Sequence, residues 1–194
     1  GFGGQPPVGG QQRFINATDQ LLAMLASLQP VAAAQGARIG LALHSLRAVP
    51  PDALRAAITG LDAIDVSAPI HIHVAEQIRE VEECLSWSGL RPVEWLLSTV
   101  GLGPRWCLVH ATHMNAAEAA AAAATGAVAG LCPSTEANLG DGVFDMGAWR
   151  QHGGVWGLGS DSHVTVNAAE ELLPALQRAV ALNKPVVIDV YMKN

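Results

Sequence analysis

Residues 69–74 read PIHIHV and residues 106–111 read WCLVHA. Each stretch is a short apolar run that ends in polar chain, and a stretch with helical spacing lies between the two. Short apolar runs separated by helices are typical of βαβ units and of a parallel sheet. A histidine, His73 or His110, falls at the end of each run.

The same pattern recurs on both sides of these two stretches, and it predicts five strands in all. The other three strands are expected at 38–43, 127–132 and 155–159. Helices are expected at about 17–35, 52–61, 77–86, 91–100, 115–125, 145–152 and 167–182, with residues 1–16 and the polar stretch after Cys132 as loops. Residues 183–194 form a tail of uncertain structure.

Polar residues follow the predicted strands at their C-terminal ends. They are His44, His73, His110, Ser134 and Asp161. In a (β/α)8 barrel the active site is built at that rim. A Rossmann sheet binds ligands at the same edge, but the sequence contains neither its glycine fingerprint nor a P-loop.

A whole barrel needs eight strands and roughly 250 residues. Five strands in 194 residues therefore predict an α/β fold that is the C-terminal portion, about strands 4 to 8, of a TIM-like barrel spanning residues 1–182. On this interpretation the chain is a fragment without the N-terminal part, and its open sheet edges would favour self-association, including a homodimer.

The composition excludes several classes of protein. Half of the residues are hydrophobic and 14% are charged, which excludes a disordered chain. The net charge of −6 and the lack of a basic patch argue against nucleic acid, and no apolar run is long enough for a membrane span. Three cysteines with no CxxC pair argue against a disulfide framework. Two of them, Cys107 and Cys132, lie in apolar runs that favour buried, reduced thiols, which suits a cytoplasmic protein.

Four groups near the strand ends could bind a metal ion: His71, His73, His110 and Asp161. Imidazole and carboxylate ligands suit zinc or a similar divalent ion. A single histidine at a strand end is more often an ordinary hydrogen-bonded residue, but packing alone rarely produces four such groups in turn. Asp161 alone could instead be a helix cap.

Two further charged residues have open interpretations. Glu76 lies past the strand end, where it could shuttle protons or could be a solvated residue at a helix N-terminus. Arg47, just after His44 in the stretch HSLR, offers a planar fork that matches a carboxylate, or it is an ordinary loop arginine.

Several motifs resemble the amidohydrolase superfamily. They are HIHVAEQ (71–77), LVHATH (108–113), GLCPSTEANLGDGVF (130–144) and GSDSH (159–163). Together with GFGGQPP (1–7), LHSLRAV (43–49) and RPVEWLL (91–97), they are similar to the branch that deiminates N-formimino-L-glutamate in histidine degradation. The resemblance runs to about Leu173.

The resemblance implies a hydrolase with Zn²⁺, or another divalent metal such as Fe²⁺. It implies that His73 and Asp161 bind the metal and that Asp161 also activates the water. Glu76 would be the proton shuttle, and His110 would contact the attacked centre.

The implied substrate is a small anionic amidine, whose hydrolysis would give N-formyl-L-glutamate and ammonia. His44 and Arg47 would contact this substrate, and His71 would be structural. The family's first-strand HxH pair is absent, so the chain supplies two of four expected ligands and is an incomplete enzyme. His71 and His73 could be that pair, but too few strands follow them.

Two other readings stay open. One is another deaminase of the same superfamily, acting on a purine, a pyrimidine or a related amidine. The other is a non-catalytic fragment that keeps these residues by descent.

Overall fold

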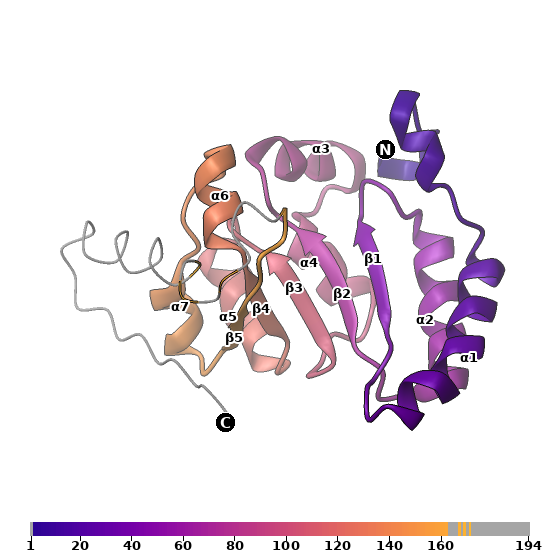
Figure 1. Ribbon diagram of the computed structural model, residues 1–194. Coiled ribbons are helices and arrows are strands. Elements are labelled where there is room, and N and C mark those ends of the chain that lie inside the picture. Colours follow the sequence, from indigo (N-terminus) through magenta and orange to yellow (C-terminus); the bar gives the residue numbers. More distant parts are fainter. Residues whose placement is uncertain (1, 163–166, 168, 170, 172–194) are drawn as a thin grey trace.

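The computed structural model describes residues 2–162, 167, 169 and 171, and its centre is a parallel sheet (Figure 1). The five strands follow one another in chain order, and each pairs in parallel with the next. They are β1 (Leu41–Ser45), β2 (Ile70–Val74), β3 (Trp106–His110), β4 (Val128–Leu131) and β5 (Val155–Leu158). The five predicted strands are therefore confirmed, and all C-terminal ends lie at one edge.

Helices connect the strands and cover one face of the sheet. They are α1 (Thr18–Ala34), α2 (Pro51–Asp65), α3 (Ile78–Ser88), α4 (Pro92–Thr99), α5 (Ala116–Ala124), α6 (Pro133–Leu139) and α7 (Met146–Gln151). In Figure 1, α4 and α5 lie behind the sheet and α3 lies above it. None of the helices in the described residues is long and apolar enough to span a bilayer.

Two segments that were expected to be loops contain helices. Residues 1–16 include the 3₁₀ helices η1 (Phe2–Gly4) and η2 (Gly9–Phe14), and the polar stretch after Cys132 contains α6. Pro133 begins α6 with a preset φ, and Gly140 ends it in the left-handed conformation (φ 72°). The predicted helix at 167–182, apart from residues 167, 169 and 171, and the tail at 183–194 lie outside the described residues.

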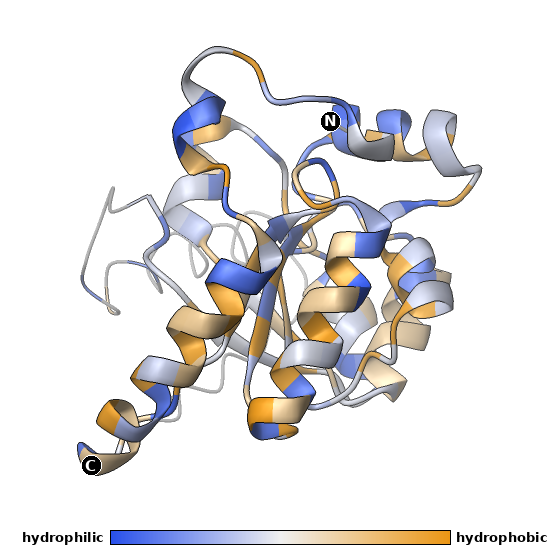
Figure 2. Ribbon diagram, turned by 90° about the vertical axis from the view of Figure 1, so that its right-hand side faces the viewer, coloured by the Kyte–Doolittle hydropathy of each residue, from blue (hydrophilic) through white to orange (hydrophobic). Residues whose placement is uncertain are grey.

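The alternation of the strands separates a buried face from an open one. Ile70, Ile72 and Val74 are at most 1% exposed and pack towards the helices, whereas His71, between them, is exposed. The view from the side of α1 and α2 shows bands of hydrophobic residues on the helices between hydrophilic ones (Figure 2). The core therefore lies between the sheet and its helices.

The three cysteines are all free thiols, as predicted; Cys84 and Cys132 are buried, whereas Cys107, which was expected to be buried, is only half-buried. Burial raises the pKa of Cys84 to about 11 and the pKa of Cys132 to about 12. Both thiols are thus protonated and weakly reactive near neutral pH.

The contact between the starts of β1 and β2 gives a test of the packing. A Cβ added at Gly40 would lie 2.1 Å from the backbone oxygen of Pro69. Gly40→Ala should therefore lower the free energy of unfolding of the intact protein by about 1–3 kcal/mol, measured by chemical denaturation. Gly101→Ala is the control, because no atom lies within 4 Å of its added Cβ. Equal stability of the two variants would contradict this packing.

Candidate metal centre

The strand ends share an unusual backbone conformation. His44, Ala75, His110, Ala111 and Asp161 have φ of 45°, 49°, 65°, 50° and 42°. Each of these residues carries a Cβ, and the left-handed region costs such residues about 1–3 kcal/mol. Strain of this kind collects at functional sites, and here it collects at the rim where β1, β2, β3 and β5 end.

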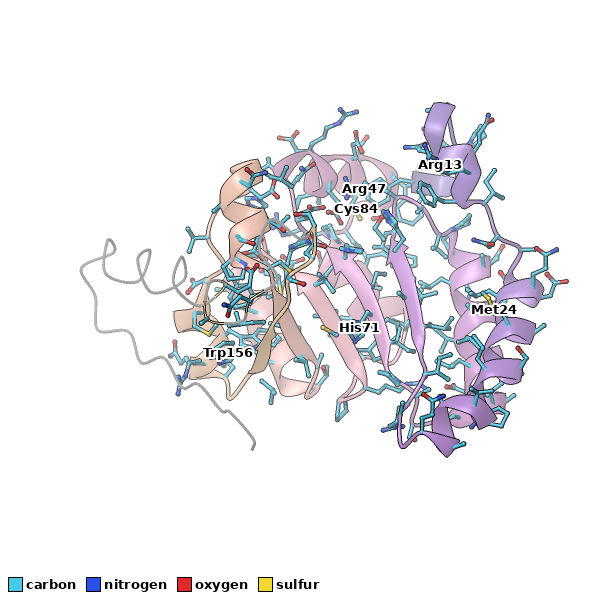
Figure 3. All side chains as sticks on the ribbon, in the orientation of Figure 1. Arg13, Met24, Arg47, His71, Cys84 and Trp156 are labelled. Carbon is cyan, nitrogen blue, oxygen red and sulfur yellow. The ribbon has the colours of Figure 1, made fainter. Side chains whose placement is uncertain are left out.

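Three predicted site residues come together at this rim. His73, His110 and Asp161 each offer a ligand atom, and these atoms all lie within 4.8 Å of one another. The rings of His73 and His110 stack with centroids 5.6 Å apart. Strand alternation would place His110 on the helix-covered face, so we attribute its turn towards His73 to its left-handed backbone. His71 lies further down the sheet, away from Arg47 at the rim (Figure 3).

His73 is already oriented for a metal ion. Its Nδ1 lies 2.7 Å from the backbone oxygen of His44. A carbonyl oxygen can only accept, so Nδ1 carries the hydrogen and Nε2 keeps its lone pair. Metal-binding histidines are commonly oriented by a hydrogen bond of this kind from the other ring nitrogen. Two imidazoles and a carboxylate form a donor set that fits zinc or a similar divalent ion.

Glu76 lies beside this group. Its Oε1 is 3.7 Å from Nε2 of His110, its Oε2 accepts a hydrogen bond of 3.3 Å from Arg47, and its side chain is 15% exposed. The sequence left two positions open for the Glu76 side chain: exposed to solvent at a helix N-terminus, or turned back towards the strand ends. In the structure it is turned back, beside His110.

A buried carboxylate supports the turn that carries Glu76. Glu80 is completely buried, and its two oxygens accept hydrogen bonds of 3.0 Å from the backbone N–H groups of Ala75 and Glu76. Burial raises the pKa of Glu80, while Arg47, 3.8 Å away, opposes that shift. Sequence analysis missed this residue; its position one helical turn after Glu76 was the available signal.

A second buried carboxylate supports His110. Oε1 of Glu136, a residue of α6, lies 3.3 Å from Nδ1 of His110 and accepts a 2.8 Å hydrogen bond from the backbone of Cys132. Burial alone would lower the pKa of His110, but Glu136, Glu76 and Asp161 together raise it. Sequence analysis missed Glu136 because it assigned this stretch to a loop.

The two predicted substrate residues also lie next to the group. The ring of His44 is 5.3 Å from that of His73. Desolvation and the neighbouring His73 and Arg47 side chains lower the pKa of His44, which favours its neutral form. Arg47 is 31% exposed and lies between the carboxylates of Glu76 and Glu80. Its guanidinium is therefore already paired in part.

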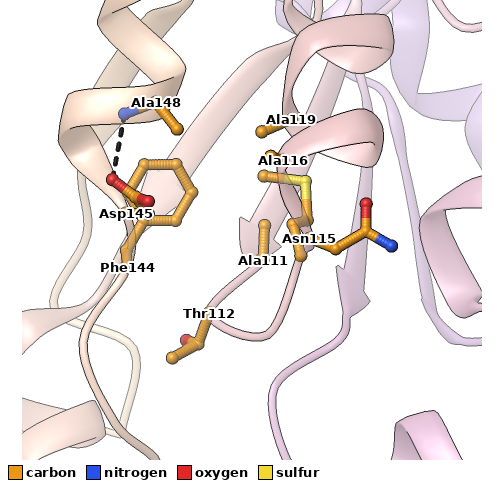
Figure 4. Close-up of a pocket in the computed structure, with 9 residues that line it drawn as sticks. Ala111, Thr112, Asn115, Ala116, Ala119, Phe144, Asp145 and Ala148 are labelled. Carbon is orange, nitrogen blue, oxygen red and sulfur yellow. Dashed lines mark hydrogen bonds between the residues drawn. The ribbon is translucent and has the colours of Figure 1, made fainter.

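A small cavity lies outside this group, between α5 and α7 (Figure 4). It is lined by Ala111, Thr112, Met114, Asn115, Ala116, Ala119, Phe144, Asp145 and Ala148. Its volume of about 20 Å³ holds no more than one water molecule. We therefore place the site at the strand ends, not in this cavity.

Comparisons with known proteins agree on one family. Residues 4–191 match the model of the amidohydrolase family. The chain is 52% identical over 172 residues to formimidoylglutamate deiminase of Pseudomonas aeruginosa. This match covers 89% of this chain and 37% of that protein. It is 35% identical over 144 residues to 8-oxoguanine deaminase of the same organism, and this match covers 73% of this chain and 32% of that protein.

A solved structure extends the agreement to the fold. An amidohydrolase from Brucella melitensis superposes with a TM-score of 0.86 at 46% identity, covering 94% of this chain and 40% of that one. The predicted fold class, part of a TIM-like (β/α)8 barrel, is confirmed. The chain spans about a third of the length of the curated relatives it matches.

The role of Glu80 can be tested by stability. Glu80→Gln offers one acceptor where the carboxylate offers two, so it leaves a buried backbone N–H unpaired. We expect the free energy of unfolding of the full-length protein to fall by about 1–3 kcal/mol, measured by chemical denaturation. Glu83→Gln on the same helix is the control, since its ion pair with Arg79 is at the surface. If both variants unfold alike, Glu80 does not hold the turn.

Proposed function

The chain belongs to the amidohydrolase family, and we propose that the full-length protein hydrolyses N-formimino-L-glutamate to N-formyl-L-glutamate and ammonia. The identity of 52% to a formimidoylglutamate deiminase, against 35% to an 8-oxoguanine deaminase, carries this choice of substrate. The geometry of the rim supports it, because an arginine lies beside the group that would do the chemistry.

Amidohydrolases are typically metal-dependent. In this chain His73 and Asp161 would hold the metal, with zinc favoured by the donor set and Fe²⁺ as another candidate. A divalent metal at this position would lower the pKa of water towards neutrality and so make it a nucleophile at physiological pH.

The side chains of the rim would divide the proton transfers between them. Asp161 orients the attacking water and accepts its first proton. The oxygen of the water bonds to the formimino carbon while His110 contacts the attacked centre. Glu76 takes up the second proton of the water and delivers it to the terminal nitrogen, and Asp161 passes the first proton to the same nitrogen. The carbon–nitrogen bond breaks, and both water protons leave in the ammonia. General acid–base catalysis of this kind requires a side chain within hydrogen-bond reach of the reacting atoms.

Arg47 and His44 would bind a carboxylate of the substrate. The planar fork of Arg47 can pair with two oxygens, and neutral His44 can donate or accept beside it. A second candidate function has support from the same residue. Glu76 and Glu80 already pair with Arg47, which leaves less charge for a substrate anion and favours a neutral substrate such as a purine.

The proton shuttle gives a direct test of the chemistry. Glu76→Gln in the metal-loaded, full-length protein should lower kcat for ammonia release from N-formimino-L-glutamate by about 10²–10⁴-fold, because the amide cannot carry the proton. Glu82→Gln, an exposed change on α3, should leave kcat unchanged. A Glu76→Gln enzyme with wild-type turnover would exclude Glu76 as the shuttle.

The substrate assignment has its own test. Arg47→Lys keeps the charge but loses the fork, so kcat/KM for N-formimino-L-glutamate should fall about 10–100-fold, the equivalent of one or two charged hydrogen bonds. Arg55→Lys, which changes an exposed arginine of α2, is the control. Turnover of 8-oxoguanine without turnover of N-formimino-L-glutamate would favour the second candidate.

A further inference from the structure

We propose that Glu136 is a positioning residue that fixes the tautomer and the ring orientation of His110, so that Nε2 of the neutral ring presents a lone pair to the reacting water. The inference rests on the proposed function for the identity of the reaction. Its structural part, the tautomer, can be tested without any substrate.

The contact between the two side chains defines the tautomer. Oε1 of Glu136 lies 3.3 Å from Nδ1 of His110, and the two residues are 3% and 1% exposed. An ionised carboxylate only accepts hydrogen bonds, so the hydrogen of a neutral His110 ring must sit on Nδ1. The hydrogen bond made by one ring nitrogen decides the state of the other, so Nε2 is left as an acceptor.

Glu136 is itself fixed at both its side chain and its backbone. Its Oε1 also accepts 2.8 Å from the backbone N–H of Cys132, and its carbonyl oxygen accepts 3.0 Å from the backbone N–H of Asp141. The carboxylate therefore has little freedom to rotate away from His110. Together with the left-handed backbone of His110, it holds the imidazole in one orientation.

The fixed orientation of the His110 ring places its Nε2 among the residues that would carry out the reaction. Nε2 lies 3.7 Å from Oε1 of Glu76, in the group that His110 forms with His73 and Asp161. An acceptor here can take a hydrogen bond from the attacking water and aim its oxygen at the formimino carbon. Placing a reactant in this way contributes to rate mainly through orientation.

A purely structural role for Glu136 is the competing explanation. Its hydrogen bond to Cys132 resembles the capping of a helix N-terminus and would stabilise α6 by itself. That role accounts for the hydrogen bond to Cys132 but does not account for the contact with His110. A readout on the His110 ring separates the two roles.

The first experiment uses the wild-type, full-length protein. ¹⁵N NMR of histidine-labelled enzyme should show the hydrogen of neutral His110 on Nδ1, with its signal identified by its loss in His110→Asn. A hydrogen on Nε2 would overturn the proposal, whatever the activity. Failure of N-formimino-L-glutamate turnover with the hydrogen on Nδ1 would instead count against the proposed function alone.

Variants then connect the tautomer to the rate. Glu136→Gln keeps an acceptor oxygen, so it should retain the Nδ1 hydrogen and most of kcat. Glu136→Ala should lose the single tautomer and lower kcat about 10–100-fold, with KM and metal content little changed. Glu136→Ala with the wild-type tautomer, or with wild-type kcat per folded molecule, would show that the role is structural and would overturn the proposal.

Discussion

Where the strands end, five residues that carry a Cβ adopt the left-handed backbone conformation that glycine adopts at lower cost. Buried carboxylates on the helices that follow stabilise two of these strand ends. Glu80 accepts from two N–H groups of the turn after β2, and Glu136 accepts from the end of β4 and from His110. Each carboxylate thus joins a strand end to its helix. We infer that the arrangement of His73, His110 and Asp161 depends on these hydrogen bonds.

The same arrangement concentrates negative charge at the rim. Glu76, Glu80, Glu136 and Asp161 gather around two imidazoles, with Arg47 as a neighbouring cation. Like charges gathered this closely repel one another unless a counter-charge lies among them. A bound divalent cation is commonly the largest local charge in a site and would reverse that balance. The electrostatics therefore agree with the donor geometry in favouring a metal ion.

The sequence was sufficient for the sheet because each strand is a local apolar run. It was less accurate at the ends: the first strand was expected at 38–43 but spans Leu41–Ser45, since Arg38 is exposed and bonded to Ser67 instead. The rim residues could be predicted because strand ends meet at one edge in any barrel. Their roles as ligand, shuttle or substrate contact remain proposals.

The residues that support the site were not predictable in this way. The stretch that forms α6 is polar, and its buried side chains are satisfied by partners far along the chain, such as Glu136 by His110 and Ser134 by Glu171. Glu80 is paired with backbone groups of a turn that exists only in the folded protein. No local periodicity records contacts of this kind.

The central claim is that the rim holds a divalent metal, and anomalous diffraction at the zinc edge from crystals of the zinc-loaded, full-length protein tests it most directly. We predict one strong peak between Nε2 of His73 and the carboxylate of Asp161. A peak elsewhere, or none at saturating zinc, would contradict the account.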